Sequence, residues 1–366
     1  MSDRSHRRRW CAVLAVAVVA VAVIGAPSAY ATERAPRAAV VSTTPAAATP
    51  TPTTPLTPTA PTPLTPTAPT PMTPTTPAAP VPTGTKAVPA AVPTPDHIVV
   101  VVEENEDASA IIGNKAAPYL TSLAARSATF THARAETHPS QPNYMALFSG
   151  GQQGVSDDSC VGRLSAPNLG SELLAAGKSF VGYSEDLPRA GFTGCTSGRY
   201  AQKHSPWTAF ADIPAASNQP WTAWPADYAQ LPTVSWVTPN LCDDMHDCGV
   251  ASGDRWLEAN LAGYLSWAAT HNSWLIVTWD EASDSSPDNG IATMVAGAGV
   301  RPGRYAEQID HYSLLRTIEN AYGLQPLGDS ATAEPITDIW APAASSAAGR
   351  SGPTVAPAPA GDQLSR

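Results

Sequence analysis

Five apolar runs recur along the central part of the chain, each bounded by polar or turn-forming residues. They are continuous rather than alternating, which is typical of strands buried on both faces of a largely parallel sheet. The runs predict strands at HIVVVVEEN (97–105), SFVGYSED (179–186), TVSWVTPN (233–240), SWLIVTWDE (273–281) and IATMVAGAG (291–299).

Helical patterns alternate with these runs. Residues 118–127 begin with a proline, which suits a first helical turn, and residues 257–268 repeat apolar side chains at helical spacing. A third pattern covers residues 313–322 and stops at Gly323, a residue typical of helix ends. Alternating strands and helices predict an α/β fold. We expect a three-layer α/β/α sandwich with a largely parallel central sheet, formed by residues 96–342.

The start of the chain carries the features of an export signal. Arg7–Arg9 precede an apolar run from Trp10 to about Ala26, and the small-residue sequence Ala29-Tyr30-Ala31 follows. This order predicts a signal peptide at residues 1–31 with cleavage after Ala31. An uncleaved membrane anchor is the alternative, although the run is short for a ~20-residue span. We therefore expect a secreted protein, extracellular or associated with the cell wall, without stable membrane insertion after cleavage.

A proline- and threonine-rich segment separates the signal from the predicted domain. Residues 38–95 contain 17 prolines and one charge, and the eight-residue unit PLTPTAPT occurs at 55–62 and again at 63–70. Such a composition cannot bury a core. We expect residues 32–95 to form a disordered, extended stalk, whose threonines could accept O-linked sugars. Residues 343–366, rich in Ala, Gly, Pro and Ser, are expected to be a disordered tail.

The charge of the chain argues against two classes of partner. The whole chain has a formal charge of −10, and without residues 1–31 it keeps 17 basic and 30 acidic residues, a charge of −13. Nucleic-acid binding depends on lysines and arginines that neutralise phosphates, so we expect no nucleic-acid partner. The chain also lacks the basic amphipathic helix of proteins that lie on anionic membranes.

Four cysteines remain after the signal, and an even number in an exported protein predicts two disulfides. Three pairings are possible. Cys242–Cys248 is the natural local pair, which leaves Cys160–Cys195. The alternative is a metal site built on CDDMHDC (242–248), but thiolates seldom stay free in an oxidising compartment.

Polar and acidic residues stand where four of the predicted strands end. The carboxyl ends of strands in an open α/β sheet form one edge, where ligands bind. Acidic groups on that edge repel one another unless a cation lies among them. Polar residues also follow many strands without a function, so a metal site and ordinary strand ends both stay open. The residues are Glu104-Asn105, Glu185-Asp186, Asn240 with Asp243 and Asp244, and Asp280-Glu281.

Ser140 lies between two prolines in ETHPSQPNYMALFSG (136–150), which leads into a helix-like apolar segment. A stiffened serine suits a plain loop, and it equally suits a nucleophile that must be held still. If the hydroxyl joins the acidic edge, a divalent metal there would activate it and polarise a phosphoryl oxygen. Oxygen ligands favour Mg, Ca or Mn, and nearby imidazoles keep Zn and Fe open. His246 and His311 are then candidates to donate a proton or stabilise phosphate charge.

Five motifs in a fixed order resemble one family. They are VVEEN (101–105), THPSQPNYMALFSG (137–150), DMHD (244–247), VTWDE (277–281) and DHYSLLRTIENAYGL (310–324). Together they resemble the bacterial phosphoesterase family, which covers acid phosphatases and phospholipases C of the alkaline-phosphatase-like superfamily. The resemblance spans roughly residues 97–340, and its specificity comes from the five motifs together.

The resemblance implies roles for individual residues. Ser140 would be the nucleophile that becomes transiently phosphorylated, presented at the mouth of a helix whose N-terminal amides face the phosphate. The implied metal ligands are Glu104, Asn105, Asp280 and Glu281, the last where larger acid phosphatases of the family often have aspartate. The implied catalytic and phosphate-pocket residues are His246 and His311, with Asn143 and Asp247 as further candidates. His138, two residues before Ser140, suits either a pocket residue or a hydrogen-bonding support, and His204, beside Lys203, suits either phosphate binding or a solvated loop.

The implied activity is that of a secreted, metal-dependent acid phosphatase. It would hydrolyse phosphate monoesters through a phosphoserine, with a divalent metal ion of open identity as its cofactor. A phosphoinositide headgroup is one candidate substrate. A phospholipase C-type phosphodiesterase is the second interpretation, and a stalked surface protein that binds without turnover is the third.

Overall fold

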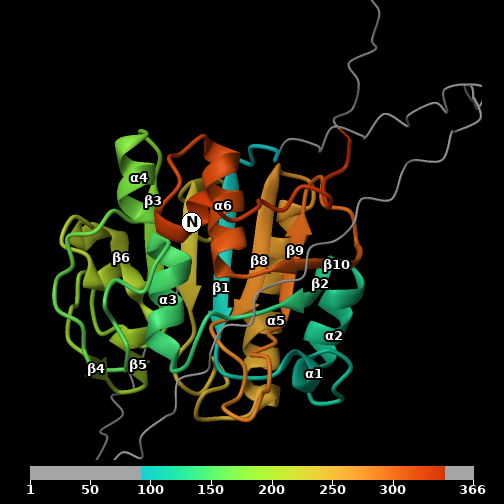
Figure 1. The fold of residues 1–366 in the computed structure, drawn as a ribbon, viewed down its shortest axis with the longest axis horizontal. Helices are drawn as coiled ribbons and strands as arrows, with labels where there is room; N and C mark the ends of the chain where they lie inside the picture. Colours follow the sequence, from blue (N-terminus) through green and yellow to red (C-terminus); the bar gives the residue numbers. More distant parts are fainter. Residues whose placement is uncertain (1–91, 343–366) are drawn as a thin grey trace, which may run out of the picture. The chain divides into compact units, whose positions relative to one another are not determined.

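The computed structural model describes residues 92–342, drawn in colour in Figure 1. The predicted signal peptide, nearly all of the predicted stalk and the predicted tail lie outside these residues. None of the described helices is both long enough and apolar enough to cross a membrane.

An eight-stranded sheet forms the centre of the fold, in the order β10-β2-β9-β8-β1-β7-β3-β6. All neighbouring pairs are parallel except those made by β9, which runs antiparallel to β2 and β8. The strands are β1 (His97–Glu103), β2 (Ala128–Ala133), β3 (Phe180–Ser184), β6 (Asn218–Pro220), β7 (Val234–Thr238), β8 (Ser273–Trp279), β9 (Thr293–Gly297) and β10 (Gly303–Ile309). A separate hairpin pairs β4 (Thr196–Ser197) with β5 (Tyr200–Ala201).

Helices cover both faces of this sheet. Figure 1 shows α3, α4 and α6 in front of it, and α5 behind it, where α5 contacts β8, β9 and α2. The helices are α1 (Ala108–Ile111), α2 (Pro118–Ala125), α3 (Ser140–Ser149), α4 (Leu169–Ala175), α5 (Val250–Ala268) and α6 (His311–Tyr322). The predicted α/β/α sandwich with a largely parallel sheet is therefore confirmed.

The five predicted strands correspond to β1, β3, β7, β8 and β9, because each is apolar on both faces. In β1, residues 98–102 are at most 1% exposed, and Val100 lies between Trp236 of β7 and Ile276 of β8. Each such side chain contributes roughly 1.5–3 kcal/mol by burial. The sequence analysis missed β2, β6 and β10. Of these, β6 has three residues and β10 is mostly exposed at the sheet edge, so neither carries an apolar run.

One buried carboxylate joins α5 to α2. Asp254 is 2% exposed, and its two oxygens accept hydrogen bonds from the backbone N–H groups of Tyr119 (3.2 Å) and Leu120 (2.8 Å) in the first turn of α2. The residue before α2 is Ala117, whose side chain cannot cap the helix. Asp254 therefore acts as the N-terminal cap of a helix more than a hundred residues away.

We expect Asp254→Ala to lower the free energy of unfolding by about 2–4 kcal/mol, because it leaves two buried N–H groups without acceptors. Urea denaturation of the purified protein measures this change. Asp227→Ala is the matched control, since Asp227 caps only a short exposed turn, Tyr228–Gln230, and should change stability by less than about 1 kcal/mol. Equal losses in the two variants would contradict the capping role.

Candidate active site

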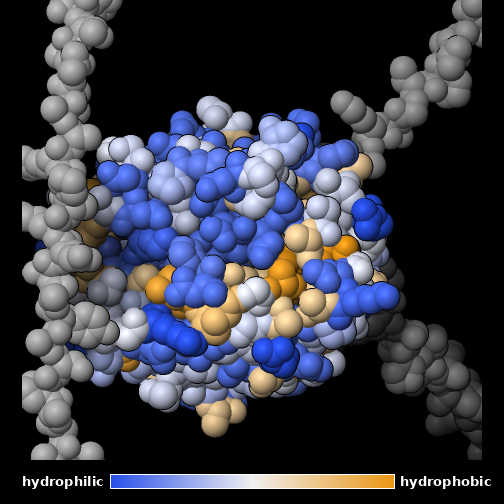
Figure 2. All heavy atoms as spheres, turned by 90° about the horizontal axis from the view of Figure 1, so that it is seen from below, coloured by the Kyte–Doolittle hydropathy of each residue, from blue (hydrophilic) through white to orange (hydrophobic). Residues whose placement is uncertain are grey.

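The carboxyl ends of β1, β7 and β8 meet at the edge of the sheet that is lowest in Figure 1. Figure 2 views this edge, where hydrophilic side chains cover much of the surface around a smaller hydrophobic band. Ser140 reaches the same edge from the first turn of α3 and is 2% exposed. Its Oγ lies 3.1 Å from Glu104 Oε2 and 3.1 Å from Glu281 Oε1. The serine hydroxyl is thus held between two carboxyl groups from two different strands.

The carboxyl groups of Glu104, Glu281 and Asp280 form a cluster next to this hydroxyl. Burial, together with Glu104 and Glu281, raises the pKa of Asp280 well above its ordinary value. Burial and Glu104 likewise raise the pKa of Glu281 to about 7. Although burial favours a neutral acid, the imidazole of His204 lowers the pKa of Glu104 to about 2. Asp280 and Glu281 therefore favour the neutral form, and ionising all three carboxyl groups together would require a cation beside them.

The donor set suits a hard divalent cation. Asp280 is 1% exposed, and its Oδ2 has no hydrogen-bond partner among residues 92–342. Its Oδ1 accepts from the backbone N–H of Asn105 at 3.2 Å, and Asn105 adopts a positive φ of 21°, a strained backbone of the kind found at functional sites. Carboxylate, amide and hydroxyl oxygens are the ligands that Mg, Ca and Mn prefer. No group of three His, Cys, Asp or Glu side chains within the described residues already has the arrangement of a metal site.

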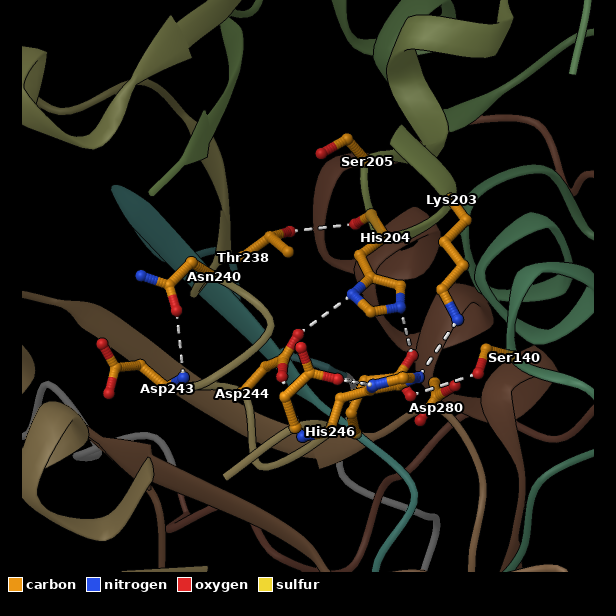
Figure 3. Close-up of polar contacts among 12 residues, drawn as sticks. Ser140, Lys203, His204, Ser205, Thr238, Asn240, Asp243, Asp244, His246 and Asp280 are labelled. Atoms are coloured by element: carbon orange, nitrogen blue, oxygen red, sulfur yellow. Dashed lines mark hydrogen bonds and ion pairs between the residues drawn. The ribbon is translucent and has the colours of Figure 1, made fainter. Parts of the chain in front are cut away.

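Basic side chains approach this cluster from the turn Gln202–His204, which follows β5 (Figure 3). His204 is 1% exposed, with Nε2 2.6 Å from Glu104 Oε1 and Nδ1 3.0 Å from Asp244 Oδ2. Burial opposes a charged imidazole, but Glu104 and Asp244 outweigh it and raise the pKa of His204 to about 9. His204 is therefore a charged, doubly anchored group rather than a mobile one.

Lys203 connects Asp158 with His246. Its Nζ lies 2.8 Å from Asp158 Oδ2 and 3.3 Å from Nε2 of His246. The other oxygen of Asp158 accepts from the backbone N–H of Gln141 at 3.0 Å. That N–H belongs to the first turn of α3, so Asp158 occupies one of the amides that we expected to face a phosphate. Lys203 and the start of α3 are thereby joined through one carboxylate.

His246 is the exposed imidazole of the group. Its side chain is 29% exposed, and its Nδ1 lies 2.8 Å from Asp247 Oδ1. The structure contains both disulfides, Cys160–Cys195 and Cys242–Cys248, and the second encloses the loop that carries His246.

Replacing both Cys242 and Cys248 with serine should lower kcat about tenfold or more, because small positioning errors at a reacting group are costly. So short a ring should contribute only about 2 kcal/mol to global stability. Activity assays and thermal melting measure the two effects. Replacing Cys160 and Cys195 gives the comparison, since that pair closes a longer segment and should cost more stability. An unchanged kcat in the Cys242/Cys248 variant would show that the bridge does not position His246.

The polar side-chain atoms of two predicted site residues already have hydrogen-bond partners within the protein. Asn143 is 0% exposed; its Oδ1 accepts from the N–H groups of Glu136 and Thr137, and its Nδ2 donates to Thr137 O. His311 is also 0% exposed, and its ring nitrogens contact Glu136 Oε2 and the carbonyl of Trp279. Contrary to expectation, neither side chain has a free polar atom for phosphate. Both brace the loop before Ser140 instead.

His138 lies next to the carboxyl groups at Ser140. His138 Nδ1 lies 2.7 Å from Glu281 Oε2, which ties it to the carboxyl group beside Ser140. The sequence analysis did not assign Asp158 or Lys203 to the site. Lys203 had a signal, since it directly precedes His204, but Asp158 stands in a polar segment without a motif.

Comparison with known proteins shows which family the chain belongs to. The chain belongs to the phosphoesterase family, whose model matches residues 113–325. The resemblance predicted from the five motifs is therefore confirmed, and with it the prediction of an enzyme.

The chain is also similar to individual proteins of known name or structure. The chain is 52% identical over 254 residues to the phosphatidylinositol-3-phosphatase of Mycobacterium tuberculosis, covering 69% of this chain and 85% of that protein. It is 28% identical to an acid phosphatase of Aspergillus fumigatus, covering 56% of this chain and 51% of that one. A solved Vibrio parahaemolyticus protein of the alkaline phosphatase superfamily is similar with a TM-score of 0.45 and 12% identity, covering 68% of this chain and 72% of that chain. The chain thus spans most of the mycobacterial protein and about half of the fungal one.

Proposed function

We propose that the protein is a metal-dependent acid phosphatase that forms a phosphoserine at Ser140. The observation that carries this proposal is the position of Ser140 Oγ, 3.1 Å from carboxyl groups of two strands at the mouth of α3. A hydroxyl that donates to a carboxylate has a proton acceptor in place, as the activation of a serine nucleophile requires. The names of the mycobacterial and fungal relatives support a phosphate ester as substrate.

The oxygens of Glu104, Asp280 and Glu281, with the side chain of Asn105, would hold the metal ion. When bound, the ion supplies positive charge that neutralises this cluster and polarises the phosphoryl group. The unpartnered Oδ2 of Asp280 supports this assignment, since a buried carboxylate oxygen without any donor is otherwise unfavourable.

Hydrolysis would proceed in two displacements. Ser140 Oγ gives up its proton to the carboxyl groups beside it and bonds to phosphorus, while the bond from phosphorus to the ester oxygen breaks. The leaving alkoxide takes a proton, which we assign to the pair of Lys203 and His246, because the Lys203 ammonium donates to Nε2 of the exposed imidazole. Water then attacks phosphorus and passes its proton to the same pair, while the bond from phosphorus to Ser140 Oγ breaks and the carboxyl group returns its proton to Ser140 Oγ, which releases phosphate.

Lys203 would bind the phosphate oxygens. Its Nζ stands between Asp158 and His246, and Glu104 and Asp158 outweigh burial to raise the pKa of Lys203, so the group stays charged. A fixed ammonium group at this point stabilises the charge of the transferring phosphoryl group. We therefore assign phosphate binding to Lys203 and His246, in place of Asn143 and His311.

The substrate class we propose is phosphate monoesters, including phosphatidylinositol 3-phosphate. The support for the phosphoinositide is the name of the mycobacterial relative, of which this chain covers 85%. We also propose that the protein is exported, because two disulfides are typical of oxidising compartments.

The proposal is tested by substrate and metal dependence. Purified protein should release phosphate from p-nitrophenyl phosphate and from phosphatidylinositol 3-phosphate, and should cleave bis-p-nitrophenyl phosphate at least about a hundredfold more slowly. Chelation should abolish turnover, and adding back a divalent ion should restore it. Preference for the diester would instead favour a phosphodiesterase, and full activity after complete metal removal would exclude the metal.

A further inference from the structure

Asp158 joins two groups of the candidate active site that come from different parts of the chain. Its Oδ2 accepts from Lys203 Nζ at 2.8 Å, and its Oδ1 accepts from the backbone N–H of Gln141 at 3.0 Å. Among residues 92–342 Lys203 forms its salt bridge with Asp158 alone, and the two side chains are 17% and 32% exposed. One carboxylate at the rim of the site therefore fixes the ammonium group relative to the start of α3.

The start of α3 has few backbone N–H groups for a phosphate. The first four N–H groups of a helix have no partner within the helix, but here two of the four positions are Pro139 and Pro142, which have no N–H. The amides of Ser140 and Gln141 are left, and Asp158 accepts from the second. A phosphate at Ser140 therefore has the Ser140 amide and depends on a side chain such as Lys203 for further donors.

The loop that carries Asp158 is fastened to α3 on both sides of this residue. Gln141 is 0% exposed. In the orientation that pairs donors with acceptors, its side-chain nitrogen donates to the carbonyls of Asp157 at 3.2 Å and Ser159 at 2.7 Å. The backbone next to Asp158 is thus held against the helix that begins with Ser140.

The same loop is also tied to the turn that carries Lys203. Cys160 forms a disulfide with Cys195, and the carbonyl of Cys195 accepts from the backbone N–H of Gln202 at 2.9 Å. Gln202 directly precedes Lys203 in the turn. The backbones on the two sides of the ion pair are therefore fixed relative to each other, so the pair is a built contact rather than a chance meeting of two long side chains.

We propose that Asp158 is a positioning residue, which holds the ammonium group of Lys203 where it meets the oxygens of a phosphate at Ser140. The inference rests on the proposed function, because it takes phosphate binding by Lys203 from there. A lysine side chain has four rotatable bonds and carries a point charge without a preferred direction. Ordering that side chain opposes binding, so a carboxylate that orders it beforehand strengthens binding of the phosphate.

A carboxylate next to a phosphate site can also act as a competitor that the phosphate must displace. The two roles predict changes of opposite sign when the charge of Asp158 is removed. A competitor has to leave, whereas the contacts of Gln141 and the Cys160–Cys195 disulfide keep the Asp158 loop in place. These contacts favour the positioning role.

The test measures binding of inorganic phosphate to the full chain by isothermal titration calorimetry. Asp158→Asn keeps a side-chain oxygen for the N–H of Gln141 but loses the charge that holds Lys203. It should raise the Kd of phosphate about tenfold and lower kcat/KM for p-nitrophenyl phosphate by a similar factor. Asp157→Asn is the matched control, because Asp157 is an exposed neighbour whose carboxylate accepts from the N–H of Ser159. It should keep both values within about twofold.

A second variant shows whether Asp158 acts through Lys203. Lys203→Met should itself weaken phosphate binding about tenfold or more, because it removes the charged donor. Adding Asp158→Asn to Lys203→Met should then change the Kd by less than about twofold, since no ammonium group is left to position. A residue that only stabilises the fold would not show this dependence on Lys203.

Several outcomes would overturn the proposal. Unchanged or tighter phosphate binding by Asp158→Asn is one, and tighter binding would indicate a competing carboxylate. A tenfold loss that persists in the Lys203→Met background is another, as is a wild-type protein that binds no phosphate at millimolar concentration. If Asp158→Asn does not fold, Asp158→Ser, which also keeps an oxygen without a charge, repeats the measurement. Phosphate binding with the expected coupling, but without release of phosphate from esters, would count against the proposed function alone.

Discussion

Replacing Ser140 with alanine should lower release of phosphate from p-nitrophenyl phosphate by at least about 10⁴-fold, since loss of a nucleophile removes the covalent route. The fold should persist. Among residues 92–342 the hydrogen bonds of Ser140 Oγ go to Glu104 and Glu281, and no backbone group depends on it. Steady-state kinetics and circular dichroism measure the two properties.

Ser149→Ala is the matched control for this variant. Ser149 lies in the same helix, is also 2% exposed, and donates to Met145 O within the helix. It should keep activity within about threefold, as expected for a side chain that does not contact the reacting atoms. Mass spectrometry of acid-quenched wild-type protein should find phosphate on Ser140. A well-folded Ser140→Ala variant with substantial turnover would remove the nucleophile assignment.

The second large effect concerns Asp280. Asp280→Asn should lose most bound metal and lower activity by at least about 10³-fold, because it removes a charged ligand from a small set. In metal-free protein near neutral pH the same change should raise the melting temperature by a few degrees. Burial, Glu104 and Glu281 raise the pKa of Asp280, so above its ordinary pKa this carboxyl destabilises the fold, whereas the amide of asparagine does not titrate. The two effects have opposite signs, which a general folding defect cannot produce.

Elemental analysis and thermal melting with and without divalent ion check this prediction. The wild-type protein should gain stability when the ion is added, and Asp280→Asn should not. Asp288→Asn is the control, because Asp288 follows the same strand but is exposed and paired with Arg134. Full metal content in Asp280→Asn would show that Asp280 is not a ligand.

The strands that build the sheet were predictable because their requirement is local. A strand buried on both faces needs apolar residues at successive positions, and residues 98–102 supply them. β10 was missed for the opposite reason. It lies at the sheet edge with most side chains exposed, so burial imposes no pattern on its sequence.

The residues of the candidate site also differ in whether the sequence predicted them. Ser140 stood out because two prolines flank it, and Glu104 and Asp280 stood out because they end apolar strands. Lys203 and Asp158 gave no comparable signal. Asp158 lies in a loop after α3 and Lys203 in the turn Gln202–His204, and they meet only because this turn and this loop lie against the start of α3.

The sequence by itself determined the α/β sandwich and the family and supplied the candidate site residues at the sheet edge, because apolar runs record burial and ordered motifs record the polar groups residue by residue. Only the tertiary structure decided which polar atoms are free. Asn143 and His311 carry suitable groups, but Glu136 and the carbonyl of Trp279 occupy them. A hydrogen-bond partner can lie more than a hundred residues away, so local sequence cannot show whether a donor or acceptor is already used.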